Sequence, residues 1–279
     1  LNEGARGLLL ANVRVPTFTW GDLQAQMAAC RVGERRMHEM FEKYGTDTMQ
    51  QAMEWAMDYS EQLMRAEIKK IPDGTYTFAD YLDNDGIEKE REIKIHVKIT
   101  VKESNITFDF SGSDRQVKGS ANCVLGVLTS ATYCALYNLT DPTIPPNHGC
   151  YRPVTIIAPE GLVVNAKFPS AVVSGNTETA LRIIDTITGA LAKVIPEKVI
   201  ASDGGTTTNH IAGGVDPRSN ELYTWYLAAD PVGWGARATK DGFGLIGGAR
   251  IGGNVSQIPM EVFETRYPFF VEEYSIVQD

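Results

Sequence analysis

Apolar residues spaced three or four positions apart predict two consecutive helices in the first quarter of the chain. The first runs from Asp22 to Tyr44, and Gly45 follows it as a stop. Thr46 or Asp47 caps the second, which runs through Lys70, and its methionine-rich face is typical of core packing. Because a single residue joins them, we expect the two helices to pack as an antiparallel hairpin.

The pattern changes to strands after the turn at residues 72–74. From residue 93 to residue 102, apolar and polar residues alternate strictly, which predicts a strand with one buried and one wet face. His96 falls on the polar face, so we expect it to be solvated. The segment ITFDF that follows predicts an antiparallel partner, and residues 153–166 (PVTIIAPEGLVVNA) predict a hairpin.

Residues 176–195 predict a helix that is buried on most of its sides. Two apolar stripes run along it, and only Arg182, Asp185 and Lys193 form a polar edge. Asn176 and Glu178 lie at its start, where free backbone N–H groups and the helix dipole favour an anion.

Nearly half of the chain's 26 glycines fall in residues 203–254, between short β segments such as LYTWYLAAD. The fold class is therefore α+β. We expect a helical segment over residues 1–71. A mixed domain over residues 72–279 would follow, with largely antiparallel sheets around the buried helix and a glycine-rich β segment.

Composition narrows the function classes. The net charge of -9 over 279 residues disfavours a nucleic-acid partner, which needs a basic face. No apolar run is long enough to cross a membrane. The four cysteines lack C-x-x-C spacing and are typical of reduced thiols in a cytoplasmic protein.

Common catalytic motifs are missing from the sequence. Residues 233–238 (GWGARA) match G-x-G-x-x-A, but the glycine-rich stretch after them cannot continue as the helix that a dinucleotide site needs. There is no phosphate-binding loop G-x-x-x-x-G-K-[ST], and the four histidines are scattered, so we expect no structural metal site built from this chain alone.

Polar residues on irregular backbone are the better site candidates. Functional side chains often lie on loops that a rigid scaffold positions. The candidates for substrate binding are Asn122, Asn147, His148, Asn176 and Glu178, and those for catalysis are Trp234, Arg237 and Asp241. The alternative is structural: asparagine caps helices and turns, and Arg237 pairs with Asp241.

Several collinear segments resemble the hydantoinase B family. They are LANVRVP, GDLQAQMAACRVGERR, EKYG, IPDGTY, DFSGS, KGSANC, IPPNHGCYRPV, NAKFPSAVVSGNTET and GWGAR with KDG. This family includes a subunit of ATP-dependent hydantoinases, half of 5-oxoprolinase and a large subunit of acetone and acetophenone carboxylases. Its members are about twice as long, so the resemblance implies a segment of a cleaved, split or partly ordered subunit.

The resemblance also implies cofactors and partners. ATP with Mg²⁺ would be bound by a hydantoinase A-like partner subunit, and Mn²⁺ or Zn²⁺ would be bound outside this segment, because the family's metal-binding cluster is expected in the missing half. The other expected partners are that remaining half and a small metal-binding subunit.

The implied chemistry is the activation of a carbonyl by phosphate. The partner phosphorylates a lactam or enol oxygen, and the hydantoinase B-like subunit carries out the second step. In this interpretation Trp234 stacks on the planar intermediate, Arg237 binds its phosphate or carboxylate, and Asp241 orients the arginine. Gly233 and Gly235 let the backbone close on it.

Three functions remain open. A ketone carboxylase of the acetophenone or acetone type is favoured, because those enzymes use more separate subunits and because Trp225, Trp234 and Phe243 suit an aryl substrate. The alternative is an ATP-dependent hydantoinase or 5-oxoprolinase that hydrolyses a cyclic amide. The third is a scaffold without catalytic groups.

Overall fold

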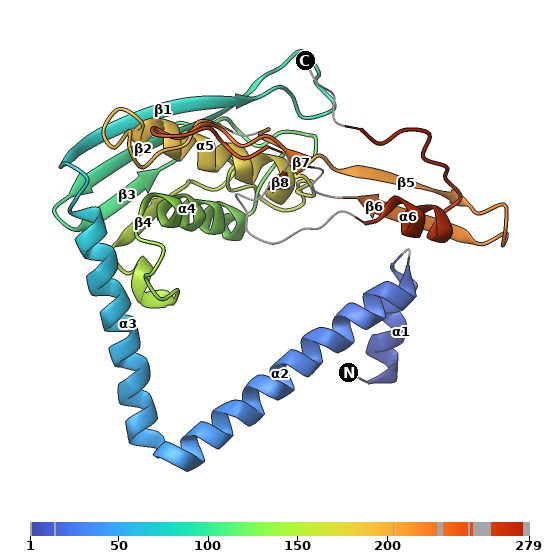
Figure 1. The fold of residues 1–279 in the computed structure, drawn as a ribbon, viewed down its shortest axis with the longest axis horizontal. Coiled ribbons are helices and arrows are strands. Elements are labelled where there is room, and N and C mark those ends of the chain that lie inside the picture. Colours follow the sequence, from blue (N-terminus) through green and yellow to red (C-terminus); the bar gives the residue numbers. More distant parts are fainter. Residues whose placement is uncertain are drawn as a thin grey trace. The chain divides into compact units, whose positions relative to one another are not determined.

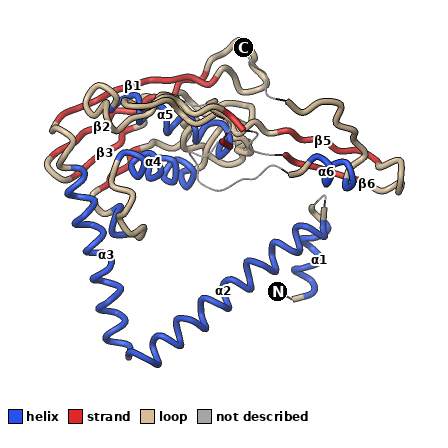
Figure 2. Tube along the Cα trace, viewed as in Figure 1, coloured by secondary structure: helices blue, strands red, loops and turns tan. Residues whose placement is uncertain are grey.

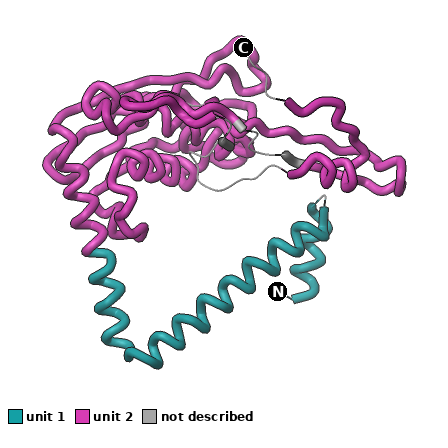
Figure 3. Tube along the Cα trace, viewed as in Figure 1, with its two compact units in different colours: residues 1–58 teal, residues 59–279 magenta. Residues whose placement is uncertain are grey.

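A computed structural model describes residues 2–13, 15–202, 204–227, 231–244, 246–247 and 258–275. The chain divides into two compact units, residues 1–58 and residues 59–279, which Figure 3 colours separately. The predicted boundary after residue 71 coincides with the change from helix to strand, whereas the compact units part within a helix. Across the described residues, no helix has both the length and the apolarity needed to span a bilayer.

The first unit is helical. It contains α1 (Glu3–Ala11), α2 (Pro16–Tyr44) and the beginning of α3 (Thr46–Ile68). Asn2 caps α1, because its side chain accepts a hydrogen bond from the backbone N–H of Ala5 at 2.8 Å. Gly45 ends α2 with φ of 81°, a conformation that a residue with a side chain rarely adopts.

The predicted packing of the two long helices is not found. No residue of α2 is buried, whereas Met49 and Met64 of α3 are. The spacing of apolar residues correctly indicates two helices joined by Gly45. Spacing cannot indicate which surface covers the apolar face of α2, because that depends on tertiary contacts.

A four-stranded sheet supports the second unit (Figures 1 and 2). Its order is β1 (Gly74–Leu82), β2 (Ile93–Lys102), β3 (Asn105–Asp109) and β4 (Val154–Ile157). The first three strands are antiparallel, and β4 runs parallel to β3 with Ile156 opposite Phe108. The hairpin predicted for residues 153–166 is therefore wrong: its first half pairs with β3, and its second half forms only isolated bridges.

The core lies between this sheet and two helices, α4 (Leu125–Leu139) and α5 (Ala180–Leu191). The apolar residues of β2 are buried as predicted, with Ile95, Val97 and Ile99 fully inaccessible. α5 lies against β1 and β2, and α4 packs on α5 (Figure 1). Only Arg182 and Gly189 of α5 keep partial exposure, so the predicted central helix is confirmed. Each fully buried leucine or isoleucine contributes about 1.5–3 kcal/mol.

The glycine-rich segment forms small sheets, as predicted. β5 (His210–Val215) pairs antiparallel with β6 (Leu222–Leu227), and β7 (Pro231–Val232) pairs with β8 (Ile246–Gly247). The last helix, α6 (Met260–Arg266), covers β6 through aromatic contacts. Trp225 meets Phe263 and Phe269 edge to face, with ring centroids 5.1 Å and 5.6 Å apart.

The predicted solvation of His96 holds only in part, because its side chain is half-buried. Its Nδ1 is buried without a hydrogen-bond partner, because the turn at Gly112 covers the imidazole so closely that a Cβ there would collide with it. Burial lowers the pKa of His96 below its usual value of 6.5, and Lys94 and Lys98 lower it further, while Asp109 acts in the opposite direction.

We expect His96 to make stability depend on pH. Between its folded and usual pKa the unfolded chain binds more protons, so the free energy of unfolding falls as pH drops below 6.5. Urea unfolding between about pH 5 and pH 7.5 measures this slope. His96→Gln should flatten it, whereas His148→Gln, at an exposed histidine, should leave it. An unchanged slope in His96→Gln would contradict the assignment.

Candidate functional site

The predicted site residues lie in three parts of the second unit. Asn176 and Glu178 begin α5, with Asn122 packed beneath them. Asn147 and His148 lie near α3, and Trp234, Arg237 and Asp241 lie in the glycine-rich segment. The first and third groups both lie beside one segment, residues 197–202 and 204–207, which we call the strap.

The strap runs antiparallel to α5. The hydroxyl of Ser202 donates a hydrogen bond to the carboxylate of Asp185 at 2.8 Å. Further along, the N–H of Thr207 donates to the carbonyl of Thr177 at 3.2 Å. On its outer side, the N–H of Ala201 donates to the carbonyl of Ala236 at 2.9 Å. The strap therefore links the start of α5 to the segment that carries Trp234 and Arg237.

A π-helical turn, η2 (Gly175–Thr179), precedes α5. Gly175 lies so close to the backbone of Asn122 and Cys123 that no side chain fits there. Single π turns often occur at functional sites, because they redirect a side chain from the helical path. Here the turn places Glu178 beside the strap.

Glu178 lines a cavity of about 430 Å³, which we call the Glu178 cavity. Its wall is largely polar and comes from four segments: residues 82–86, the pair Ser120 and Ala121, residues 174–182 around the start of α5, and the strap residues 204–206. The hydroxyls of Ser120 and Ser174 lie 2.7 Å apart on this wall and form a hydrogen bond. Such a cavity can bind a small polar molecule.

The carboxyl of Glu178 is suited to proton transfer. Burial raises its pKa above the usual 4.5, and hydrogen bonds from Thr206 and Thr177 oppose this shift. A carboxylate with a raised pKa is a stronger base than an exposed one and can accept a proton from water. Perturbed carboxyls in cavities are candidates for catalysis.

Arg182 brings its guanidinium to the same cavity, where two carboxylates offset its charge. Its Nη1 donates to Asp80 Oδ2 at 2.9 Å and lies 3.8 Å from Asp185 Oδ2. Its Nε is buried without a hydrogen-bond partner. Sequence reasoning treated Arg182 only as part of a polar edge. The signal was the spacing of Glu178, Arg182 and Asp185, which puts three ionisable groups on one face of a buried helix.

Asn122 does not line the cavity; its side chain holds the backbone behind the cavity wall. It is fully buried, and its Oδ1 accepts from the N–H of Val117 at 2.8 Å. Its Nδ2 shares its protons among the carbonyls of Val117, Gly119 and Ala171. These bonds use the whole amide, so the side chain holds the 117–122 loop against residue 171.

Asp85 fixes the opposite wall of the cavity. Its carboxylate accepts from the backbone N–H groups of Ile87, Glu88 and Gly119 at 2.9, 2.7 and 2.9 Å. These hydrogen bonds lower the pKa of Asp85, so it stays ionised. Gly119 lies against the backbone of Asp85, where a Cβ would collide.

The remaining asparagines and His148 lie elsewhere. Asn176 is exposed on the π turn. Asn147 caps a short helix, η1 (His148–Tyr151), by accepting from Gly149 at 2.8 Å, and it donates to the hydroxyl of Ser60 at 2.8 Å. His148 is exposed beside it. The structure does not bring this pair to the Glu178 cavity, whose lining excludes both.

Trp234 and Arg237 line a second cavity of about 310 Å³, which we call the Trp234 cavity. Apolar residues of α4, α5 and the strap form its floor: Leu139, Ile184, Val199 and Ile200. The guanidinium of Arg237 lies over the ring of Phe243, 5.5 Å from its centroid. Two of the three residues predicted for catalysis therefore line one cavity, and their catalytic role stays a prediction.

Two details of the predicted arrangement differ. Asp241 is exposed, and among the described residues no ion pair joins it to Arg237. Gly235 and Gly242 approach backbone of Ala201 and Trp234, so these glycines permit chain-to-chain packing instead of contact with a ligand. Nothing lies close to Gly233.

Metal ligands do not gather in this part of the protein. Over the described ranges, no three His, Cys, Asp or Glu side chains are placed to hold an ion.

We expect Asn122→Ala to destabilise the protein by about 3 kcal/mol, since each buried backbone group left without a partner costs roughly 1–3 kcal/mol. Chemical denaturation of the full-length protein measures the change. The control is Asn176→Ala, an exposed position, which should stay within about 0.5 kcal/mol. Equal effects of the two variants would refute the supporting role of Asn122.

Comparison with known proteins shows which family the chain belongs to and how much of its relatives' length it spans. A model of the hydantoinase B/oxoprolinase family matches residues 1–279. A D-/L-hydantoinase component from Pseudomonas sp. (strain NS671) is 37% identical, over 96% of this chain and 46% of that protein. The chain spans about half the length of the curated relatives that it matches at 32–37% identity.

Two solved structures share the fold. The ATP-dependent caprolactamase from Pseudomonas jessenii superimposes with a TM-score of 0.88 and 29% identity, over 100% of this chain and 48% of that one. A nucleotide-free acetone carboxylase superimposes with a TM-score of 0.83 over 95% of this chain and 37% of that one. At 18% identity, the second likeness shows the fold alone.

Proposed function

The chain belongs to the hydantoinase B/oxoprolinase family, and from this premise we propose that it is part of a subunit that opens cyclic amides in an ATP-dependent enzyme. The observation that carries this proposal is the Glu178 cavity, which combines a carboxyl of raised pKa, a guanidinium and two hydroxyls. These are the groups that water attack on an activated carbonyl requires.

The relatives favour a cyclic amide over a ketone. The hydantoinase and caprolactamase named above both act on ring amides by their names, and they are 37% and 29% identical to this chain. The ketone carboxylase favoured by the sequence has only the more distant fold likeness in its support. Hydrolysis therefore replaces carboxylation as the preferred reaction.

Activation is needed because an amide carbonyl is a poor electrophile. We propose that ATP with Mg²⁺ is held by a hydantoinase A-like partner subunit, which transfers phosphate to the amide oxygen. Any Mn²⁺ or Zn²⁺ would be held by the other half of this chain's own subunit or by a small metal-binding subunit, since the described residues offer no group of ligands.

Within the cavity, each residue has a separate role. Glu178 accepts a proton from the attacking water and passes it to the ring nitrogen as the C–N bond breaks, and the free Nε–H of Arg182 faces the negative charge that develops on the reacting group. A second water then hydrolyses the resulting acyl phosphate to the carboxylate and inorganic phosphate. Asp80 and Asp185 fix the guanidinium of Arg182 by the contacts described above. Ser120 and Ser174 offer hydroxyls to the polar edge of the ring.

We expect Glu178→Gln to lower kcat for ring opening by about 100-fold or more, with a small change in KM, because a general base contributes roughly 10²–10⁴-fold. The assay uses the full-length subunit with its ATP-binding partner and follows release of the ring-opened product. In the wild type, kcat should fall as pH drops through the raised pKa of Glu178, because only the ionised carboxylate accepts a proton.

The matched control is Glu221→Gln, which makes the same change at an exposed glutamate and should leave kcat unchanged. The reaction class is tested by ATP hydrolysis with a hydantoin or lactam, against a ketone with bicarbonate. If only the ketone with bicarbonate stimulated ATP hydrolysis, the proposed reaction would be carboxylation and not ring opening. Full turnover in Glu178→Gln would show that Glu178 is not the general base.

A further inference from the structure

We propose that the Trp234 cavity is a separate binding site for a small carboxylate with a flat apolar body. Its volume of about 310 Å³ is at the lower end of the range for small-molecule sites. None of the residues that line it also lines the Glu178 cavity. A ligand could therefore occupy it independently of the Glu178 cavity.

The floor of the cavity selects an apolar body. Leu139 comes from α4, Ile184 from α5, and Val199 and Ile200 from the strap, and the ring of Trp234 completes the surface. Covering such a surface with a planar ring removes apolar area from water, and each Å² contributes about 25 cal/mol. Trp234 adds an aromatic face for stacking.

Arg237 selects a negative charge. Its guanidinium is partly buried and lies over Phe243, and within the described residues no carboxylate forms an ion pair with it. Partial burial weakens its hydration without supplying a counter-charge, so a bound anion would be favoured. A guanidinium presents two parallel N–H donors, which match the two oxygens of a carboxylate.

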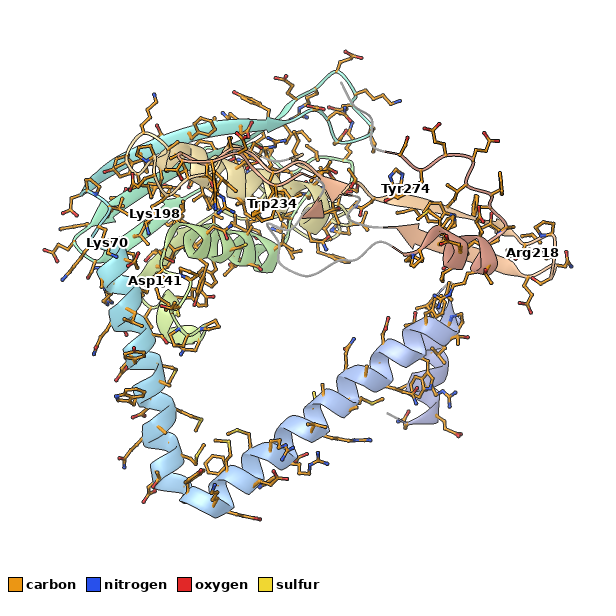
Figure 4. The ribbon with its side chains drawn as sticks, in the orientation of Figure 1. Lys70, Asp141, Lys198, Arg218, Trp234 and Tyr274 are labelled. Carbon is orange, nitrogen blue, oxygen red and sulfur yellow. The ribbon has the colours of Figure 1, made fainter. Side chains whose placement is uncertain are left out.

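The other charges at the cavity favour a single negative charge on the ligand. Lys198 also lines the cavity, but its Nζ lies 3.9 Å from Glu67 Oε2 and near Asp141, beside Lys70 (Figure 4). Its charge is therefore already balanced. The exposed carboxylate of Glu197 lies on the same rim and repels any anion. The repulsion is stronger for a phosphate dianion than for a carboxylate, which carries one charge.

Benzoate is the probe for this site, and the intrinsic fluorescence of the full-length protein is the readout. We expect benzoate to change the emission of Trp234, and Trp234→Phe to abolish that change. Trp225→Phe is the matched control, since Trp225 packs on Phe263 and Phe269 outside the cavity. The fluorescence change on adding benzoate should persist in Trp225→Phe.

Isothermal titration calorimetry measures how much the charge of Arg237 contributes to the affinity for benzoate. Arg237→Gln should weaken benzoate binding by about 10-fold or more, as expected for the loss of a charge-assisted pair. Arg266→Gln makes the same change at an exposed arginine on α6 and should have no effect. Benzamide, which has the same shape without charge, should bind at least about 10-fold more weakly than benzoate.

Three outcomes would overturn the proposal: equal binding of benzamide and benzoate, binding that Arg237→Gln leaves intact, or a fluorescence change that survives Trp234→Phe. Tighter binding of phenyl phosphate than of benzoate would contradict the preference for a carboxylate. Because these assays measure binding without turnover, they stand apart from the ring-opening test. Loss of activity in Glu178→Gln with intact benzoate binding separates the two sites.

Discussion

The central constraint in the second unit is that α5 is buried yet carries ionisable side chains. A charged group inside a protein is costly unless partners replace its hydration. Asp80 of β1 and Asp185 of α5 surround Arg182, and Ser202 of the strap binds Asp185. Satisfying the polar face of α5 therefore fixes both the sheet and the strap relative to it.

Both cavities are consequences of that arrangement. The strap meets α5 and the turn before it through hydrogen bonds of Ser202 and Thr207, and strap residues next to these two contacts line the two cavities. The Glu178 cavity opens near the start of α5, where the π turn displaces the helix, and the Trp234 cavity opens near residues 184 and 188. Hydrogen bonds of Asn122 and Asp85 hold together the loops that line the first cavity.

The glycine-rich segment contributes by close packing of backbone. Gly235 and Gly242 allow the chain to approach Ala201 and Trp234, which brings the indole of Trp234 to the edge of the strap. This explains why glycine is concentrated around a tryptophan and an arginine. The same residues would be separated from α5 if side chains stood at those positions.

The sequence by itself determined the helices, the alternating strand β2, the central helix and the family. These follow from periodicity, from turn residues and from motifs, which are local in the chain. It also singled out Glu178, Trp234 and Arg237 from their positions. Only the tertiary structure decided that β4 pairs with β3, that Nδ1 of His96 and the side chain of Asn122 are covered, and that Arg182 joins Glu178. Pairing, burial and ion-pair geometry depend on residues distant in sequence, such as Asp80 and Arg182, and no local pattern specifies which of them meet.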